Sequence, residues 1–156
     1  MPGQTTSEKI LSRAAGRTVP GRRARMTRRG LAIPPAGAPA KVKAVIRAGN
    51  RIAKKPYKYG GGHGVPNDSG YDCSGSVSYA LRGGRLMRGA LASGAFTGWG
   101  RGGRGRWITV YANGGHAYMV VAGLRFDTSA SNQTGTRWSA QMRSARGFVA
   151  THPPGL

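Results

Sequence analysis

The chain has 156 residues, with 27 glycines, nine prolines, one cysteine, and 25 lysines and arginines against four acidic residues, which gives a net charge of +21. This length suits one domain with a hydrophobic core, and the glycines and prolines predict many turns. One cysteine excludes an internal disulfide framework and a cysteine-rich zinc site. No apolar run approaches the roughly 18 residues that cross a membrane, which excludes an integral membrane protein.

The positive charge predicts attraction to polyanions such as nucleic acid, anionic membranes and anionic cell-wall polymers. The basic residues are scattered along the whole chain and do not gather on one recognition helix. The charge therefore indicates a class of environment and no specific partner.

Residues 1–40 are predicted to form a basic, Pro- and Ala-rich tail that is disordered, because neither helical nor strand periodicity persists there. A second interpretation is a poor export signal. The stretch TRRGLAIPPAGAPA, residues 27–40, has the outline of a twin-arginine signal with APA as a cleavage site, although two prolines interrupt its short apolar part. The folded domain is then expected to comprise residues 41–156.

Two helices are predicted at the start of this domain. Apolar residues between 42 and 53 recur at helical spacing, and this helix should end before Pro56. The glycine-rich loop YKYGGGHGVPNDSG, residues 57–70, leads to a second helix that starts near Cys73 and stops at Gly83 and Gly84. Asp72 is a good N-cap for it.

The second half of the domain is predicted to be a β-sheet. After a Gly- and Arg-rich connector at residues 85–105, four short segments are rich in β-branched and aromatic residues, and turn signals separate them. These segments are RWITVYA at 106–112, HAYMVVA at 116–122, LRFDT at 124–128 and RGFVA at 146–150. Helices followed by an antiparallel sheet predict an α+β fold.

Cys73 has the surroundings of a reactive thiol. At a helix N-terminus the helix dipole and the free amides favour a thiolate, and the same amides can stabilise an oxyanion. Ser74 leaves room for a substrate carbonyl to approach. The alternative from this local sequence is a small apolar cysteine that packs beneath the sheet.

A thiolate nucleophile needs a base and a third group that orients the base. His116 opens a predicted strand, where a turn would present its imidazole, whereas His63 lies in the glycine-rich loop and His152 near the C-terminus. Asp127 lies on the next strand of the hairpin, so its carboxylate could reach the His116 ring. The alternative for Asp127 is an acid that caps a turn.

Four segments, PYKYGG, GYDCSGSVSYAL, GGHAYMVVAG and RFDTS, resemble in this order the signature segments of the NlpC family of papain-like cell-wall cysteine peptidases. The resemblance implies an α+β papain-like fold and cleavage of peptide bonds in peptidoglycan stem peptides, without a metal or another cofactor. It also implies that Cys73 is the nucleophile, His116 the base and Asp127 the third polar residue. Relatives most often carry His, Asn or Gln at the third position, so Thr128 and Gln133 compete with Asp127.

The resemblance assigns further residues near the nucleophile. Tyr57 corresponds to a tyrosine whose hydroxyl can help to bind the substrate carbonyl, and Asp72 to an acid that in some members receives a stem-peptide amine. An aromatic residue that only packs is the alternative for Tyr57. Trp99, Trp107 and Trp138 are expected in the core or in a cleft wall.

The function predicted from the sequence is a secreted or envelope-associated cysteine endopeptidase whose partners are peptidoglycan and, by charge, anionic envelope polymers. A papain-like acyltransferase or amidase is an alternative, because a thioester can react with an acceptor other than water. A basic nucleic-acid-binding protein that uses GRRARMTRR, residues 21–29, is another. That reading leaves the cysteine, histidine and aspartate unexplained, so we expect only non-specific binding of nucleic acid.

Overall fold

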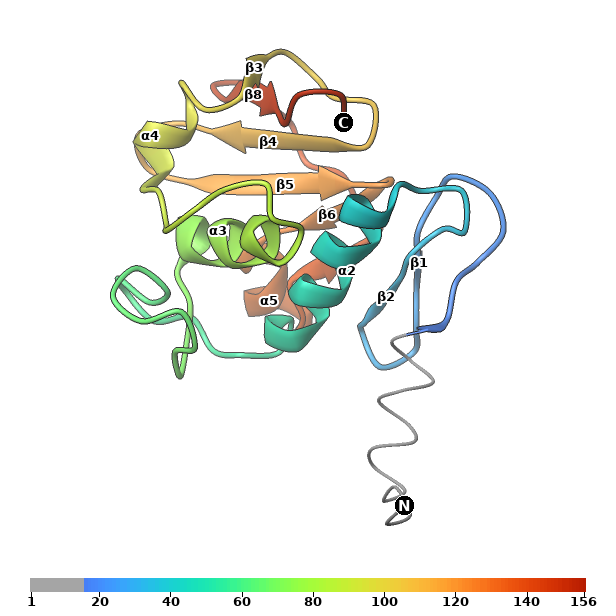
Figure 1. Cartoon of the computed structure of the whole chain (residues 1–156). Helices are drawn as coiled ribbons and strands as arrows, with labels where there is room; N and C mark the ends of the chain where they lie inside the picture. The colour runs from blue at the N-terminus through green and yellow to red at the C-terminus, as the bar shows by residue number, and fades with distance from the viewer. Residues whose placement is uncertain (1–15) are drawn as a thin grey trace, which may run out of the picture.

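The computed structural model of the chain describes residues 16–156, and its centre is a six-stranded antiparallel sheet (Figure 1). The strand order is β3-β8-β4-β5-β6-β7. The strands are β3 (Arg101–Gly102), β4 (Ile108–Ala112), β5 (Ala117–Val121), β6 (Leu124–Phe126), β7 (Trp138–Ser139) and β8 (Val149–His152). The α+β prediction is confirmed, and β3 and β7 add two strands that the sequence did not predict.

Helices α2 (Ala40–Ile52) and α3 (Cys73–Gly83) pack against each other and across the sheet (Figure 1). Helix α2 buries the apolar face that its sequence spacing predicts, with Val42, Val45 and Ile46 wholly inside. Its Gly49 lies against the Trp138 ring of β7, where an added Cβ would come within 2.7 Å of Cζ2. The absence of a side chain at Gly49 therefore lets α2 approach the sheet closely.

The central hairpins follow the predicted pattern. β4 and β5 pair with Val110 opposite Met119, and both of these side chains are buried. β5 and β6 are joined by Ala122 and Gly123, whose φ angles of 47° and 87° are those of a two-residue hairpin turn. This turn places the end of β6 beside the start of β5, which is where the candidate site lies.

The segment before α2 differs from the disordered tail that the sequence predicts. Residues 16–40 pack on the domain through the hairpin of β1 (Arg25–Met26) and β2 (Ala32–Ile33), while residues 1–15 lie outside the described residues. The Ala24 amide donates to the Ala122 carbonyl at 2.9 Å, and Ala32 and Ile33 are buried. Short apolar stretches separated by prolines carry little periodicity, so only their tertiary contacts reveal this order.

The predicted connector at 85–105 also contains structure. It holds the short helix α4 (Ser93–Phe96) and strand β3, and the Phe96 side chain is fully buried in the core. A fourth helix, α5 (Thr128–Thr134), follows β6 where the sequence predicts the end of a strand. In residues 16–156 no helix is long and apolar enough to cross a membrane.

Candidate functional site

Cys73 is the first residue of α3, as the sequence predicts. Asp72 caps this helix, because its Oδ1 accepts a hydrogen bond of 2.7 Å from the Gly75 amide. Within residues 16–156 the backbone amides of Cys73 and Ser74, in the first turn of α3, donate to no backbone carbonyl, so they can meet an anion beside the thiol. The Cys73 side chain itself is partly exposed. The cap prediction is confirmed, and the thiol lies at the positive end of a helix.

A tight turn presents His116 to the thiol. The Asn113 side-chain oxygen accepts hydrogen bonds of 2.9 Å from the amides of both Gly115 and His116. The backbone amide of Asn113 in turn donates a hydrogen bond of 3.0 Å to the backbone carbonyl of His116. His116 therefore stands immediately before β5 in a fixed orientation, with its side chain 21% exposed.

The structure brings Asp127 to the opposite edge of the His116 ring. Asp127 follows β6 and caps α5, and its Oδ1 lies 2.9 Å from His116 Nε2. Because an ionised carboxylate only accepts hydrogen bonds, Nε2 carries the proton of this bond and Nδ1 is left to face the thiol. Thr128 is buried in α5 and Gln133 is exposed, and Asp127 is the residue that contacts the imidazole.

These contacts change the ionisation of all three groups. Hydrogen bonds to Asp127 and then to Cys73 raise the pKa of His116 to about 9. Burial raises the pKa of Cys73, but hydrogen bonds from His116 and from the Ala117 amide outweigh it, so the thiol pKa is lowered. Burial likewise raises the pKa of Asp127, and hydrogen bonds from His116, Ser129 and Arg143 more than reverse it, which leaves the carboxyl strongly ionised. The geometry favours a thiolate paired with an imidazolium.

Two arginines that sequence reasoning missed hold the other oxygen of Asp127. Arg125 and Arg143 both direct Nη1 at Oδ2, and the Arg143 distance is 3.1 Å. Arg125 precedes Asp127 by two residues in an extended segment. Because residues i and i+2 of a strand point to the same face, the sequence could have predicted that these two side chains are neighbours. Arg143 comes from the irregular segment after β7, and no local pattern points to it.

The residues predicted to meet the substrate lie around Cys73. Tyr57 is half exposed, and the pKa of its hydroxyl is raised by burial and then by the nearby Cys73 and Asp72. Ser74 is buried and donates through Oγ to Asp72 Oδ1 at 3.3 Å. His63, for which no role at the site was predicted, lies beside them with Nε2 2.9 Å from the same oxygen. Asp72 Oδ2 has no protein partner within the described part of the chain.

Arg137 supports this cluster from within the core and was also missed. Its guanidinium is fully buried, and burial lowers its pKa to about 10. It donates to the Ser76 hydroxyl at 2.8 Å, and to four backbone carbonyls, those of Ile52, Lys55, Pro56 and Tyr71. One side chain therefore joins α3 to the segment that carries Tyr57.

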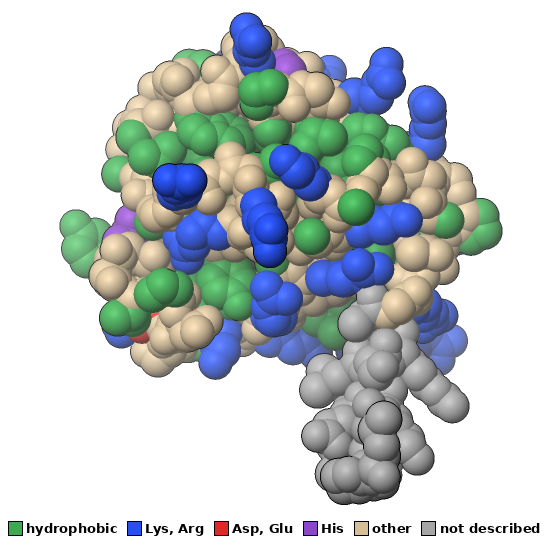
Figure 2. All heavy atoms as spheres, in the orientation of Figure 1, with side chains coloured by type: hydrophobic (Ala, Val, Ile, Leu, Met, Phe, Trp, Pro, Cys, Tyr) green, Lys and Arg blue, Asp and Glu red, His purple; other side chains and the backbone are tan. Residues whose placement is uncertain are grey.

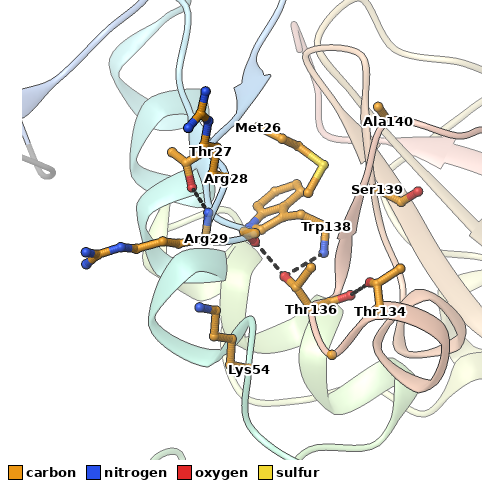
Figure 3. A pocket seen from close by; sticks show the side chains of 12 residues that line it. Met26, Thr27, Arg28, Arg29, Lys54, Thr134, Thr136, Trp138, Ser139 and Ala140 are labelled. Atoms are coloured by element: carbon orange, nitrogen blue, oxygen red, sulfur yellow. Dashed lines mark hydrogen bonds between the residues drawn. The ribbon is translucent and has the colours of Figure 1, made fainter.

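A cavity of about 590 Å³ lies away from the thiol, between the β1–β2 turn and residues 134–140 (Figure 3). Arg28, Arg29 and Lys54 line it, and the Thr136 hydroxyl donates to the Gly30 carbonyl at 2.6 Å. None of the residues around the thiol contributes to this cavity. Trp138, which also lines it, is buried in the core, while Trp99 and Trp107 pack on the core with part of their surface exposed.

His152, the third histidine, lies on β8, and its Nδ1 is 2.9 Å from the Pro153 carbonyl oxygen. Within residues 16–156, no group of three His, Cys, Asp or Glu side chains is placed to hold a metal ion. The three described acids instead pair with His or with basic residues: Asp68 with Lys58, Asp72 with His63, and Asp127 with His116 and two arginines.

Comparison with known proteins points to a domain of known structure. No protein-family model and no curated protein sequence matches the chain. The crystal structure of the P60 domain of an antigen from Mycobacterium avium subspecies paratuberculosis matches it with a TM-score of 0.51 and 24% sequence identity, over 71% of this chain and 93% of that one. The resemblance predicted from the sequence is thereby confirmed at the level of the fold: this chain has the fold of the NlpC/P60 domains.

Proposed function

We propose that the protein is a cysteine peptidase that hydrolyses peptide bonds in peptidoglycan stem peptides. One observation carries the proposal: the thiol of Cys73 at a helix N-terminus faces His116, whose far nitrogen is held by Asp127 at 2.9 Å. A nucleophile, a base and an orienting group in this relation form the arrangement that thiol-dependent acyl transfer requires. The substrate class comes from the resemblance of the sequence segments and the likeness of the fold to a P60 domain.

The reaction would begin from the thiolate–imidazolium pair. The Cys73 thiolate attacks the amide carbon, and the amides at the start of α3 donate to the developing oxyanion. We assign the Tyr57 hydroxyl, which lies near Cys73, to the same oxyanion. The His116 imidazolium gives its proton to the leaving amine, and a thioester to Cys73 remains. Neutral His116 then takes a proton from water, which attacks the thioester and releases the carboxylic acid and the thiol.

Asp72 has a proposed second role in substrate recognition. Its Oδ1 serves the helix cap and His63, whereas Oδ2 is available to accept hydrogen bonds from a substrate amine. Ser74 stands next to it with its hydroxyl 3.2 Å from His63 Nε2. This arrangement favours a stem peptide with a free amino terminus over one that is blocked.

We also propose that the protein is secreted or associated with the cell envelope. Its net positive charge supports this location. Figure 2 shows Lys and Arg side chains spread over the visible face and separated by other residues, with very little acidic surface. Such a surface concentrates a protein on anionic polymers without selecting one. It equally accounts for non-specific binding of nucleic acid.

The test is release of soluble muropeptides from purified cell walls by the wild-type protein and by Cys73→Ala. Mass spectrometry of the products identifies the bond that is cut. We expect release by the wild-type protein alone, with new amino termini inside the stem peptide. Equal release by both proteins, or none by either across walls of different cross-link chemistry, would refute the proposal.

A further inference from the structure

The second oxygen of Asp127 is held by two guanidinium groups that the proposed reaction does not use. Arg125 lies on β6 and is almost buried, and its Nε donates to the Gln141 carbonyl at 2.8 Å. Arg143 lies in the segment between β7 and β8, with its side chain 33% exposed. Both donate through Nη1 to Asp127 Oδ2.

The two carboxylate oxygens of Asp127 therefore have different hydrogen-bond partners. Oδ1 accepts from His116 Nε2 and from the Ser129 amide, both at 2.9 Å, while the donors to Oδ2 among residues 16–156 are the two arginines. A carboxylate turns about its terminal bond with a broad torsional preference, so donors on one oxygen determine where the other points. Charge-assisted hydrogen bonds to guanidinium are the strongest available for this purpose.

Arg143 also packs against two aromatic rings that lie beside the His116 imidazole. Its guanidinium lies 5.0 Å from the ring centre of Tyr118 and 5.3 Å from that of Phe148. Both of these rings have their centres 6.2 Å from the centre of the His116 ring. Its Nη1 also lies 3.3 Å from Ser129 Oγ. Arg143 therefore connects the carboxylate, the aromatic wall and the start of α5.

We propose that Arg143 is a positioning residue for the thiol site: it holds Asp127 Oδ2 so that Oδ1 faces His116, and it fixes the aromatic residues that border the imidazole. This positioning role rests on the proposed peptidase function, because that function makes the Cys73 thiol a catalytic group. The contacts of Arg143 do not depend on it. Arg125 makes the same contact from inside the sheet. Arg143 differs because it reaches the carboxylate from a separate, partly exposed segment.

Positional and purely electrostatic roles of Arg143 predict opposite changes at His116. The ionisable groups that face His116 are Cys73 from α3, Asp127 after β6 and Tyr118 from β5, with the two arginines behind Asp127. If Arg143 acted only as a nearby positive charge, its removal would raise the pKa of His116. If it positions Asp127, its removal weakens the hydrogen bond to Nε2, and the pKa of His116 falls.

The experiment compares Arg143→Met, Arg143→Lys and the control Arg146→Met. Arg146 lies in the same segment, is exposed, and its side chain makes no hydrogen bond or ion pair within the described residues. The readouts are the NMR titration of the His116 ring and the rate at which iodoacetamide alkylates Cys73, which reports the thiolate without any substrate. Thermal unfolding shows that each variant is folded.

We expect Arg143→Met to lower the pKa of His116 and to move the pH at which alkylation is half-maximal upward by about one pH unit. Arg143→Lys keeps the charge without the planar fork and should give a smaller change in the same direction. Arg146→Met should match the wild type. An unchanged or raised His116 pKa in Arg143→Met would overturn the proposal, and an unchanged value in Arg143→Lys would do so if the methionine variant does not fold.

These outcomes are separate from the fate of the peptidase proposal. If walls are not cleaved but alkylation depends on Arg143, the positioning role stands and the proposed reaction fails. If walls are cleaved but His116 titrates in Arg143→Met as it does in the wild type, the proposed reaction is supported and the positioning role is wrong.

Discussion

The buried guanidinium of Arg137 donates a hydrogen bond of 3.0 Å to the backbone carbonyl of Tyr71, the residue that precedes the cap of α3. The same guanidinium reaches the Pro56 carbonyl at 3.3 Å, one residue before Tyr57. Neither contact involves an acid, so this charge is solvated by carbonyl and hydroxyl groups of the protein itself. Arg137 therefore joins the two segments that border the thiol.

We predict that Arg137→Met destabilises the protein by about 2–4 kcal/mol, because buried carbonyls lose their donors and each such loss costs about 1–3 kcal/mol. Urea unfolding measures the free energy. The exposed Arg104 provides the control, and Arg104→Met should change stability by less than about 0.5 kcal/mol. Equal stability of the two variants would show that Arg137 contributes nothing beyond its charge.

Asp127→Asn tests the third member of the site. The amide keeps the size of the carboxylate but lacks its charge, and it leaves two arginines without their anion. We expect the pKa of His116 to fall from about 9 and kcat/KM for wall peptides to fall about 100-fold or more. Asp68→Asn removes an acid that pairs with Lys58 in the loop and should leave both quantities unchanged. An unchanged His116 pKa and wild-type activity in Asp127→Asn would show that the site does not need the charge of Asp127, since an asparagine oxygen can still accept from His116.

The pH dependence follows from the two shifted groups. The lowered pKa of Cys73 means that alkylation by iodoacetamide should be half-maximal at a pH below the ordinary thiol pKa of 9.0. The raised pKa of His116 means that peptide hydrolysis should decline above pH of about 9, since the leaving amine then has no proton donor. A hydrolysis rate that keeps rising with pH beyond that value would contradict the assignment of His116 as the acid.

Asp72→Asn separates the capping of α3 from recognition of an amine. Asparagine caps helices about as well as aspartate, so thermal stability should change little. The negative charge is lost, so KM for a stem peptide with a free amino terminus should rise about tenfold, while KM for the acetylated peptide stays the same. A similar rise for both peptides would mean that Asp72 does not bind the amine.

Gly75→Ala tests the close contact beneath the thiol. In an ordinary helix this change would stabilise by up to about 1 kcal/mol. Here the new Cβ would lie 2.0 Å from the Gly61 carbonyl oxygen and 2.9 Å from Asp72 Oδ1, so we expect the clash to dominate and to lower both Tm and activity. Gly102→Ala meets nothing within 4 Å and should leave Tm and activity unchanged. An unchanged Tm in Gly75→Ala would show that the loop that carries Gly61 can move to accommodate the new methyl group.

Much of the fold near the thiol was predictable because it depends on local interactions. Helix α3 is specified by apolar spacing, by Asp72 at its start and by glycines at its end, all within about a dozen residues. The turn before β5 is likewise specified by Asn113 and two glycines. These short-range signals were enough to place Cys73 and His116 at the ends of their elements.

Other features depend on residues far apart in the chain. The hairpin of β1 and β2 gains its order by covering α2 and the β5–β6 turn, and Phe96 becomes core only because β4 and α4 meet. Periodicity cannot reveal such segments, since each is too short to form a pattern. The prediction of a disordered segment up to residue 40 failed in its described part for this reason.

By itself the sequence predicted a cysteine at a helix N-terminus, a histidine at a strand end and an aspartate on the neighbouring strand, because backbone hydrogen bonding and side-chain periodicity operate over a few residues. In the structure this aspartate follows the last residue of β6 and caps α5. Only the tertiary structure decided that Asp127, not Thr128 or Gln133, contacts the imidazole, and that Arg143 and Arg137 support the site. A buried charge is stable only where several distant donors or acceptors converge on it, and that convergence exists only in the folded chain.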